Sequence, residues 1–245
     1  LGKRVIYQPG AAVTHFEGVS HGTDTGSGLK SYQVANQSKF LEKWSQELKG
    51  HRANGVEPML ERDRGASARV LWVEACMLTP NQDSGSLRTF RLLRILAKMG
   101  CKVTFIADNL DGAEPYRSQL TDEGIEVIHS PFSSSVRAFI ESRAREFDVI
   151  TLCRHYIAIE YVDIARASNP KARIWFDTID LHYLRSRRQF ELDGKASTRD
   201  RADLAYKEEM TVVAKSDITV VVSDVEVAEL RREDPTAKVI VIQRL

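Results

Sequence analysis

From Arg69 to the C-terminus, short apolar runs alternate with stretches of helical periodicity. The first run, Val70 to Val73, is continuously apolar with β-branched and aromatic members, which is typical of a strand buried on both faces. After a polar loop, apolar residues recur with helical spacing from Leu87 to Ala97. Because parallel strands need a crossover that is usually a helix, the repeated alternation predicts a Rossmann-like α/β domain over residues 69–245. Its doubly wound parallel sheet would carry helices on both faces.

The same patterns assign the remaining elements of this domain. Strands are predicted at 102–107, 126–129, 149–153, 173–177, 218–223 and 238–242. Helices are predicted near 115–123, 136–146, 157–167, 181–215 with a break near Gly194, and 225–232.

Residues 1–50 predict a smaller unit. Two short strands, at 4–8 and 11–15, precede a glycine-rich loop and a helix from about Leu29 to Leu48 with an apolar stripe. Two strands and a helix do not bury such a stripe alone. Since the sequence also begins with Leu1 rather than methionine, we expect that it is cut from a longer chain and that the partner surface lies upstream. Residues 51–68 lack apolar periodicity and predict a linker.

Composition excludes several classes of function. The 245 residues are 42% hydrophobic, enough for a sizeable core. With 35 basic and 34 acidic residues, the net charge of +1 favours neither nucleic acid nor an anionic membrane as partner. No apolar run approaches the roughly 20 residues of a transmembrane segment, and no signal-peptide pattern opens the sequence. We therefore expect a cytoplasmic protein.

The three cysteines support a reducing compartment. Cys76, Cys101 and Cys153 are scattered and show no C-x-x-C spacing. We interpret them as buried free thiols rather than metal ligands or catalytic thiols.

The loop after the first strand is the first candidate site, because ligands of open parallel sheets bind at the carboxyl ends of the strands. It contains Ser84, Gly85 and Ser86 and leads to Arg88. Glycine occurs in it only at position 85, so neither the dinucleotide fingerprint nor the phosphate-loop motif is present. Ser84 and Gly85 either approach a ligand or form a tight turn with a helix cap. Arg154 and Ser223 follow other strands and join the candidates.

A denser cluster follows the strand that ends at Asp177. Asp180, His182 and Arg185 stand at the opening of a helix, where they could contact an acceptor hydroxyl or a phosphate. The alternative is an aspartate cap followed by a solvated helix face, to which Arg187 and Arg188 would also belong.

His15 is the candidate in the first unit. It ends a predicted strand just ahead of the glycine-rich loop, where an imidazole could bind a metal, or it could be a purely structural histidine.

Two segments resemble known families. The segment from Gly2 to Asp24, followed by the one from Gly28 to Phe40, resembles the C-terminal tail of family 2 glycosyltransferases of the GT-A fold. In that family a histidine after the second strand helps to bind the divalent metal that holds the donor diphosphate. The resemblance implies this role for His15, with Mg²⁺ or Mn²⁺. The family's aspartate metal motif and its catalytic base would lie before Leu1.

The segment from Arg69 to Leu245 is similar to the N-terminal Rossmann half of family 4 glycosyltransferases of the GT-B fold. The similarity is carried by Asp-Ser-Gly-Ser-Leu-Arg at 83–88, Phe-Asp-Thr-Ile-Asp-Leu-His-Tyr-Leu-Arg at 176–185 and Val-Val-Val-Ser-Asp-Val-Glu at 220–226. It implies that the first loop approaches the donor diphosphate and that no cofactor is needed in this part. Many members carry His-Asp after the fifth strand. Ile179-Asp180 stands there instead, so Asp180 and His182 are the catalytic candidates. The half that grips the nucleotide sugar would follow Leu245.

Together the resemblances imply a tandem glycosyltransferase of surface polysaccharide synthesis, with a nucleotide-sugar donor and a glycan acceptor as partners. We expect this excerpt to be inactive alone. Two other hypotheses stay open: a non-catalytic scaffold of docking modules, and a Rossmann methyltransferase, for which Asp108 fits but a lone Gly85 does not. The sequence specifies neither the sugar, acceptor and linkage nor the oligomeric state.

Overall fold

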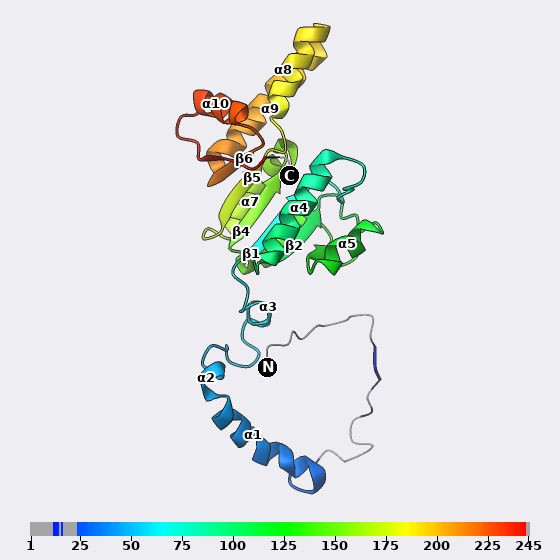
Figure 1. Cartoon of the computed structure of the whole chain (residues 1–245), viewed down its shortest axis with the longest axis vertical. Coiled ribbons are helices and arrows are strands. Elements are labelled where there is room, and N and C mark those ends of the chain that lie inside the picture. Colours follow the sequence, from blue (N-terminus) through cyan, green and yellow to red (C-terminus); the bar gives the residue numbers. More distant parts are fainter. Residues whose placement is uncertain (1–11, 15, 17–23, 244–245) are drawn as a thin grey trace. The chain divides into compact units, whose positions relative to one another are not determined.

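The computed structural model describes residues 12–14, 16 and 24–243 of the chain (Figure 1). The chain divides into two compact units, Leu1–Glu57 and Pro58–Leu245. The predicted strand at 4–8 and the metal-ligand candidate His15 lie outside the described residues.

The described part of the first unit is helical. A 3₁₀ turn, η1 (Gly28–Lys30), leads into α1 (Ser31–Lys43) and α2 (Ser45–Leu48), which confirms the helix expected from Leu29 to Leu48. The strand predicted at 11–15 was wrong for residues 12–14, which form no strand. The side chains of Tyr32, Phe40 and Leu41 are exposed.

The second unit begins before the expected boundary at Arg69. A short helix, α3 (Pro58–Arg62), lies inside the range that had been interpreted as a linker. Arg62 makes an ion pair with Glu126 (3.4 Å), and the Arg69 guanidinium donates to the carbonyl of Leu60. These contacts come from charged and backbone groups, which apolar periodicity does not detect.

The second unit contains a seven-stranded parallel sheet of order β3-β2-β1-β4-β5-β6-β7. The expected Rossmann-like doubly wound sheet is confirmed. The strands are β1 (Arg69–Glu74), β2 (Lys102–Ala107), β3 (Glu126–Ile128), β4 (Val149–Cys153), β5 (Arg173–Asp177), β6 (Ile218–Val221) and β7 (Val239–Val241).

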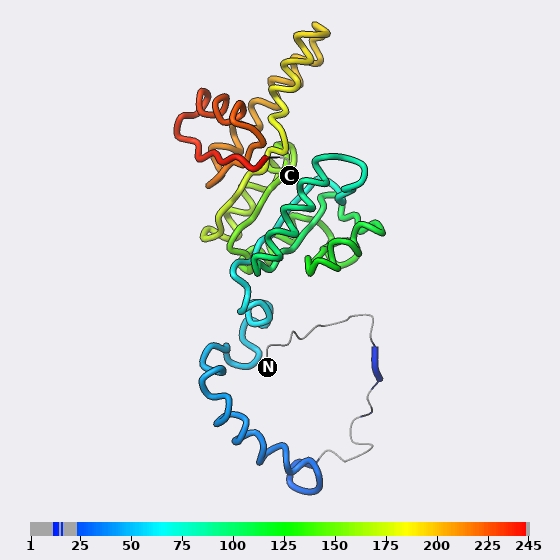
Figure 2. The backbone as a smooth tube through the Cα atoms, in the orientation of Figure 1, coloured from blue at the N-terminus to red at the C-terminus, as the bar shows by residue number. Residues whose placement is uncertain are grey.

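Helices connect the strands close to the predicted positions. They are α4 (Ser84–Lys98), α5 (Tyr116–Asp122), α6 (Val136–Arg143) with the 3₁₀ turn η2 (Ala144–Glu146), α7 (His155–Ser168), α8 (His182–Asp193), α9 (Ala196–Lys215) and α10 (Asp224–Glu233). The predicted break of the long helical region is confirmed at Gly194, whose left-handed backbone (φ +61°) ends α8. Figure 2 shows that α8 and α9 pack against each other as an antiparallel helical hairpin.

The sheet separates two apolar cores, because successive side chains of a strand point to opposite faces. In β1, Leu71 and Val73 pack into the core that also holds buried residues of α6, α7 and α9. Trp72, which lies between them, packs into the other core with α4 residues such as Leu93 and Leu120 of α5. Helices therefore cover both faces, as a doubly wound sheet requires.

The cysteines are free, as expected, but not all buried. Cys153 at the end of β4 is buried, Cys101 is half-buried and Cys76 is exposed, because it stands beyond the last residue of β1 and outside the sheet. Among the described residues, no helix is both long and apolar enough to cross a bilayer.

Candidate functional site

The loop between β1 and α4 presents the N-terminus of α4 at the carboxyl end of the sheet. Asp83 caps the helix by accepting from the N–H of Ser86 (2.8 Å), and its second oxygen accepts from the hydroxyl of Thr79 (3.0 Å). A Cβ at Gly85 would lie 3.3 Å from Cγ2 of Ile179. Glycine therefore allows this helix N-terminus to approach the loop after β5 closely.

A buried ion pair joins α4 to β5 behind this loop. Nη1 of Arg88 donates to both oxygens of Asp177, at 3.1 and 2.8 Å, and the guanidinium also donates to the carbonyl of Ile242. Both side chains are almost wholly inaccessible to solvent. Burial raises the pKa of Asp177 although Arg88 opposes this effect.

A second ion pair joins the ends of β1 and β4. Nε of Arg154 donates to Oε1 of Glu74 (2.7 Å), and Glu74 also accepts from the N–H of Ala75. Arg154 has a positive φ of 63°, which is unusual for a residue other than glycine. The buried carboxylate of Glu74 holds the guanidinium at the carboxyl edge of the sheet.

Buried carboxylates hold the loop between β5 and α8 through its backbone N–H groups. Asp177 accepts from Ile179, and Glu226 of α10 accepts from Leu181 at 3.1 Å. Glu209 of α9 accepts from the N–H groups of His182 (2.8 Å) and Tyr183 (3.0 Å), the first two residues of α8. These acceptors satisfy N–H groups that have no partner within the helix, so three different elements fix this loop.

Asp180 lies in this loop between two cationic partners. Its Oδ2 accepts from Nη1 of Arg185 (2.8 Å), and its Oδ1 lies 2.9 Å from Nε2 of His182. The imidazole is not aligned for a linear hydrogen bond, and its buried Nε2 has no other partner among the described residues. Burial alone would raise the pKa of Asp180, but His182 and Arg185 outweigh it and lower the pKa. Asp180 is therefore ionised at neutral pH.

These residues surround a small cavity of about 160 Å³ at the carboxyl ends of β1, β4 and β5. Its lining consists of Asp83, Ser84, Gly85, Arg88, Arg154, Ile179, Asp180 and Arg185. A neighbouring cavity of about 390 Å³ shares Asp180 and Arg185 and extends to Ser223 and Glu226 at the start of α10. The ion pair of Asp180 with Arg185 thus lies where the two cavities meet.

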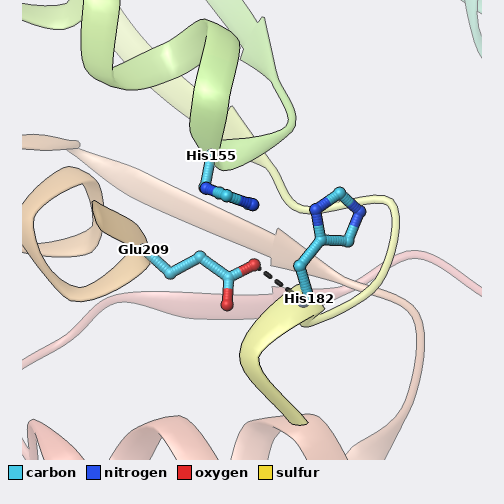
Figure 3. Close-up of side chains that lie close together, drawn as sticks. All are labelled: His155, His182 and Glu209. Carbon is cyan, nitrogen blue, oxygen red and sulfur yellow. Dashed lines mark hydrogen bonds between the residues drawn. The ribbon is translucent and has the colours of Figure 1, made fainter. Parts of the chain in front are cut away.

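Behind Asp180, two histidines and a glutamate form a buried cluster. His155 at the start of α7, His182 at the start of α8 and Glu209 of α9 each offer a ligand atom within 4.8 Å of the others (Figure 3). The imidazole rings of His155 and His182 meet edge to face with centroids 4.8 Å apart, and Nδ1 of His155 lies 2.8 Å from Oε2 of Glu208. Burial lowers the pKa of His155 and raises that of Glu209 to about 7.

The structure brings together most of the residues that were expected to contact the sugar donor or the glycan acceptor. Ser84, Gly85, Arg88, Arg154, Asp180 and Arg185 line the first cavity, and Ser223 lines the second. Ser86 is buried, and its N–H is already used by Asp83. His182 is buried behind Asp180, whereas Arg185 pairs with Asp180 while its side chain stays 65% exposed, as the solvated-face alternative expects. Whether these residues bind substrate stays a prediction.

Three residues that shape the site were not chosen as candidates in the sequence, and Asp177 was noted only as the start of the cluster after its strand. Glu74 is the last residue of β1, a position that could have drawn attention to it. His155 follows Arg154 after the end of β4, a position that could also have drawn attention to it. Glu209 lies inside a long polar helix, where nothing in the periodicity distinguishes it.

No protein-family model and no curated protein matches this sequence. The structure is similar to that of Phytolacca americana UGT2 complexed with UDP-2fluoro-glucose and pterostilbene, at 12% identity and a TM-score of 0.50. This match covers 72% of the present chain and 54% of the other, so the chain spans about half the length of the solved protein.

Two further solved structures have lower TM-scores. Apo UGT2 of Phytolacca americana scores 0.49 at 12% identity and covers 72% of this chain and 51% of that one. Glycyrrhiza uralensis UGT73P12, complexed with glycyrrhetinic acid 3-O-monoglucuronide, scores 0.46 at 12% identity and covers 71% of this chain and 48% of that one. At these identities we take from the first likeness the fold alone. The Rossmann-like fold of this chain is thus similar to that of the solved protein over 72% of the present chain.

Proposed function

We propose that residues 58–245 form one Rossmann half of a GT-B glycosyltransferase, which transfers a sugar from a nucleotide-sugar donor to a hydroxyl of a glycan acceptor. The observation that carries the proposal is the first cavity. Its lining combines two aspartates, three arginines and a helix N-terminus at the carboxyl edge of a parallel sheet. The GT-B likeness of the fold supports it.

The charges of the cavity suit a reaction in which a diphosphate leaves. The N-terminus of α4 at Ser84 and Gly85 carries a partial positive charge, and the guanidinium groups of Arg154 and Arg185, paired with Glu74 and Asp180, also reach the cavity. Together they stabilise the negative charge that develops on the diphosphate as its bond to the sugar breaks. Arg88 lines the same wall, but its guanidinium is bound by Asp177 and Ile242, so its role is to hold the wall in place.

Asp180 is the group that receives the proton in this proposal. Its carboxylate lines the cavity and accepts a hydrogen bond from the acceptor hydroxyl. As that oxygen bonds to the anomeric carbon and the diphosphate departs with its electron pair, the hydroxyl proton passes to Asp180. His182 is buried behind Asp180 and acts as a positioning residue, since it does not line the cavity. Ser223, in the adjoining cavity, is placed to contact the acceptor.

The larger architecture belongs to the same proposal. We infer that residues 1–50 belong to a GT-A glycosyltransferase that binds Mg²⁺ or Mn²⁺ partly through His15, and that the tandem protein acts in surface polysaccharide synthesis from the cytoplasm. These inferences depend on the sequence resemblance described above.

The test is a transfer assay on the full-length protein with a panel of nucleotide sugars, in which release of the nucleotide diphosphate is measured. We expect release with at least one donor, and a loss of about 100-fold or more in Asp180→Asn, which keeps the size of the side chain. Asp200→Asn, at an exposed position of α9, is the matched control and should retain full activity. No release with any donor would contradict the proposal.

The scaffold hypothesis makes the opposite prediction for the same variant. If the unit only docks a partner, Asp180→Asn leaves glycan synthesis unchanged. A methyltransferase would instead bind S-adenosylmethionine in a calorimeter. The acidic residue that would serve it, Asp108, accepts a hydrogen bond from the hydroxyl of Tyr161 in this structure.

A further inference from the structure

We propose that His155, His182 and Glu209 bind a divalent transition metal, with Zn²⁺ the best match to the ligands. The site is separate from the first cavity described above. The proposal departs from our expectation that this part of the chain needs no cofactor. It stands independently of sugar transfer.

The three groups have the identity and burial of a metal site. Two imidazoles and one carboxylate are a common ligand set for zinc with an open fourth position. His155 is 9% exposed, His182 is 6% exposed and Glu209 is fully buried. Three different helices supply them, and their ligand atoms converge within 4.8 Å (Figure 3).

Each histidine has a carboxylate beside its other ring nitrogen, hydrogen-bonded in the case of His155 and near but not aligned in the case of His182. Nδ1 of His155 faces Glu208 at 2.8 Å, and Nε2 of His182 faces Asp180 at 2.9 Å. The remaining ring nitrogens, Nε2 of His155 and Nδ1 of His182, are directed toward one another in Figure 3. Metal-binding histidines are typically held in this way, since the carboxylate fixes the tautomer and the ring orientation.

The charge of Glu209 supports a cation. Its carboxylate is buried and accepts two backbone N–H groups at the start of α8, which leaves lone pairs on both oxygens. The charged groups facing the cluster are the carboxylates of Glu208 and Asp180 and the guanidinium of Arg185, which is paired with Asp180. A bound dication would give the buried carboxylate of Glu209 a cationic partner, which it lacks in the present arrangement of these groups.

Closure around zinc requires a small movement. Ligand atoms about 2.0–2.1 Å from a tetrahedral zinc lie roughly 3.4 Å apart, whereas here they lie within 4.8 Å. The three ligand atoms therefore have to approach one another when zinc binds. With metal on Nδ1, His182 carries its proton on Nε2 and donates it to Asp180, so the metal fixes the carboxylate that faces the cavity.

The experiment measures Zn²⁺ binding to the untagged full chain, by equilibrium dialysis with elemental analysis and by the visible spectrum of the Co²⁺ form. We expect one metal per chain and a tetrahedral Co²⁺ spectrum. His155→Asn and Glu209→Gln should abolish both, and Glu208→Gln should weaken binding about 10–100-fold, because it removes the carboxylate that orients His155. His129→Asn, at a histidine after β3 and outside the cluster, should bind as the parent does.

A parent chain that binds no Zn²⁺, or His155→Asn and Glu209→Gln variants that bind it unchanged, would overturn the proposal. Circular dichroism of each variant separates loss of the ligand from loss of the fold. The Co²⁺ spectrum of the parent alone decides the coordination if both variants fail to fold, since a six-coordinate spectrum contradicts the site. Binding of metal is read without any sugar transfer, so this proposal and the proposed function fail independently.

Discussion

Arg88 and Asp177 form an ion pair that is 2% and 1% exposed and that ties α4 to the end of β5 across 89 positions of the sequence. The pair fixes the distance between the two segments that carry the candidate site, because Asp83 caps α4, Ser84 and Gly85 begin it, and Asp180 follows β5. Its loss should therefore affect both stability and the geometry of the cavity.

Arg88→Met should lower the free energy of unfolding by about 3–5 kcal/mol, because it leaves the buried carboxylate of Asp177 unpaired. Urea denaturation followed by circular dichroism measures the change. Arg199→Met is the control, since Arg199 and Asp203 are 68% and 65% exposed and lie 3.9 Å apart. We expect less than about 1 kcal/mol for the control. Equal effects of the two substitutions would contradict a structural role for the buried pair.

Gly85→Ala should impair the site through a steric clash. The new Cβ would lie 3.2 Å from Oδ1 of Asp83 and 3.3 Å from Cγ2 of Ile179, so the cap of α4 or the loop after β5 has to shift. We expect a loss of about 1–2 kcal/mol in stability and a larger relative loss in sugar transfer. Gly65→Ala, whose Cβ would meet nothing within 4 Å, should change neither quantity. Full activity of Gly85→Ala would show that the close approach is unimportant.

Low pH should weaken the hydrogen bonds by which Asp217 holds the start of β5. This carboxylate accepts from Arg166 (2.8 Å) and from the N–H of Ile174 (2.7 Å). Burial alone would raise its pKa, but these hydrogen bonds outweigh it and lower the pKa below the ordinary value of 3.8. The unfolded chain therefore binds a proton more readily, and the contribution of Asp217 is present above its unfolded pKa and lost as the pH falls through its native pKa.

We expect Asp217→Asn to be less stable than the parent at neutral pH, with a difference that shrinks as the pH falls below about 4. Urea denaturation across the acid range measures it. A difference that stays constant with pH would contradict the assignment. Asp200→Asn, at an exposed position, serves as the control.

The order of strands and helices was accessible from the sequence, whereas the connections within the site were not. Val70 to Val73 and Arg173 to Asp177 reveal their strands because burial on both faces demands apolar runs. Periodicity does not report which polar side chain reaches across the fold. Glu209 contacts the N–H group of His182 from 27 positions away, and Glu226 contacts that of Leu181 from 45.

For the candidate site residues, too, the sequence indicated their place along the fold but not their contacts. Position after a strand identified Arg154, Asp180 and the loop at Gly85, since parallel topology brings the carboxyl ends of strands to one edge. It did not separate Asp180, which lines the cavity, from His182, which is buried behind it. That difference depends on the direction in which α8 leaves the sheet. The direction is set by Glu209 of α9 and Glu226 of α10, which accept from the N–H groups at the start of α8.

The most direct test of the proposed site is an NMR titration of the full-length protein with UDP, with sulfate as the ionic control. We predict saturable shifts of the backbone amide signals of Ser84, Gly85 and Ser86 and of the signals of Arg154 and Asp180, with UDP causing them at lower concentration than sulfate. Arg154→Met should weaken them, because it removes a positive charge from the cavity. Signals at these positions that stay unchanged, or that respond equally to sulfate and UDP, would contradict a donor site at this edge of the sheet.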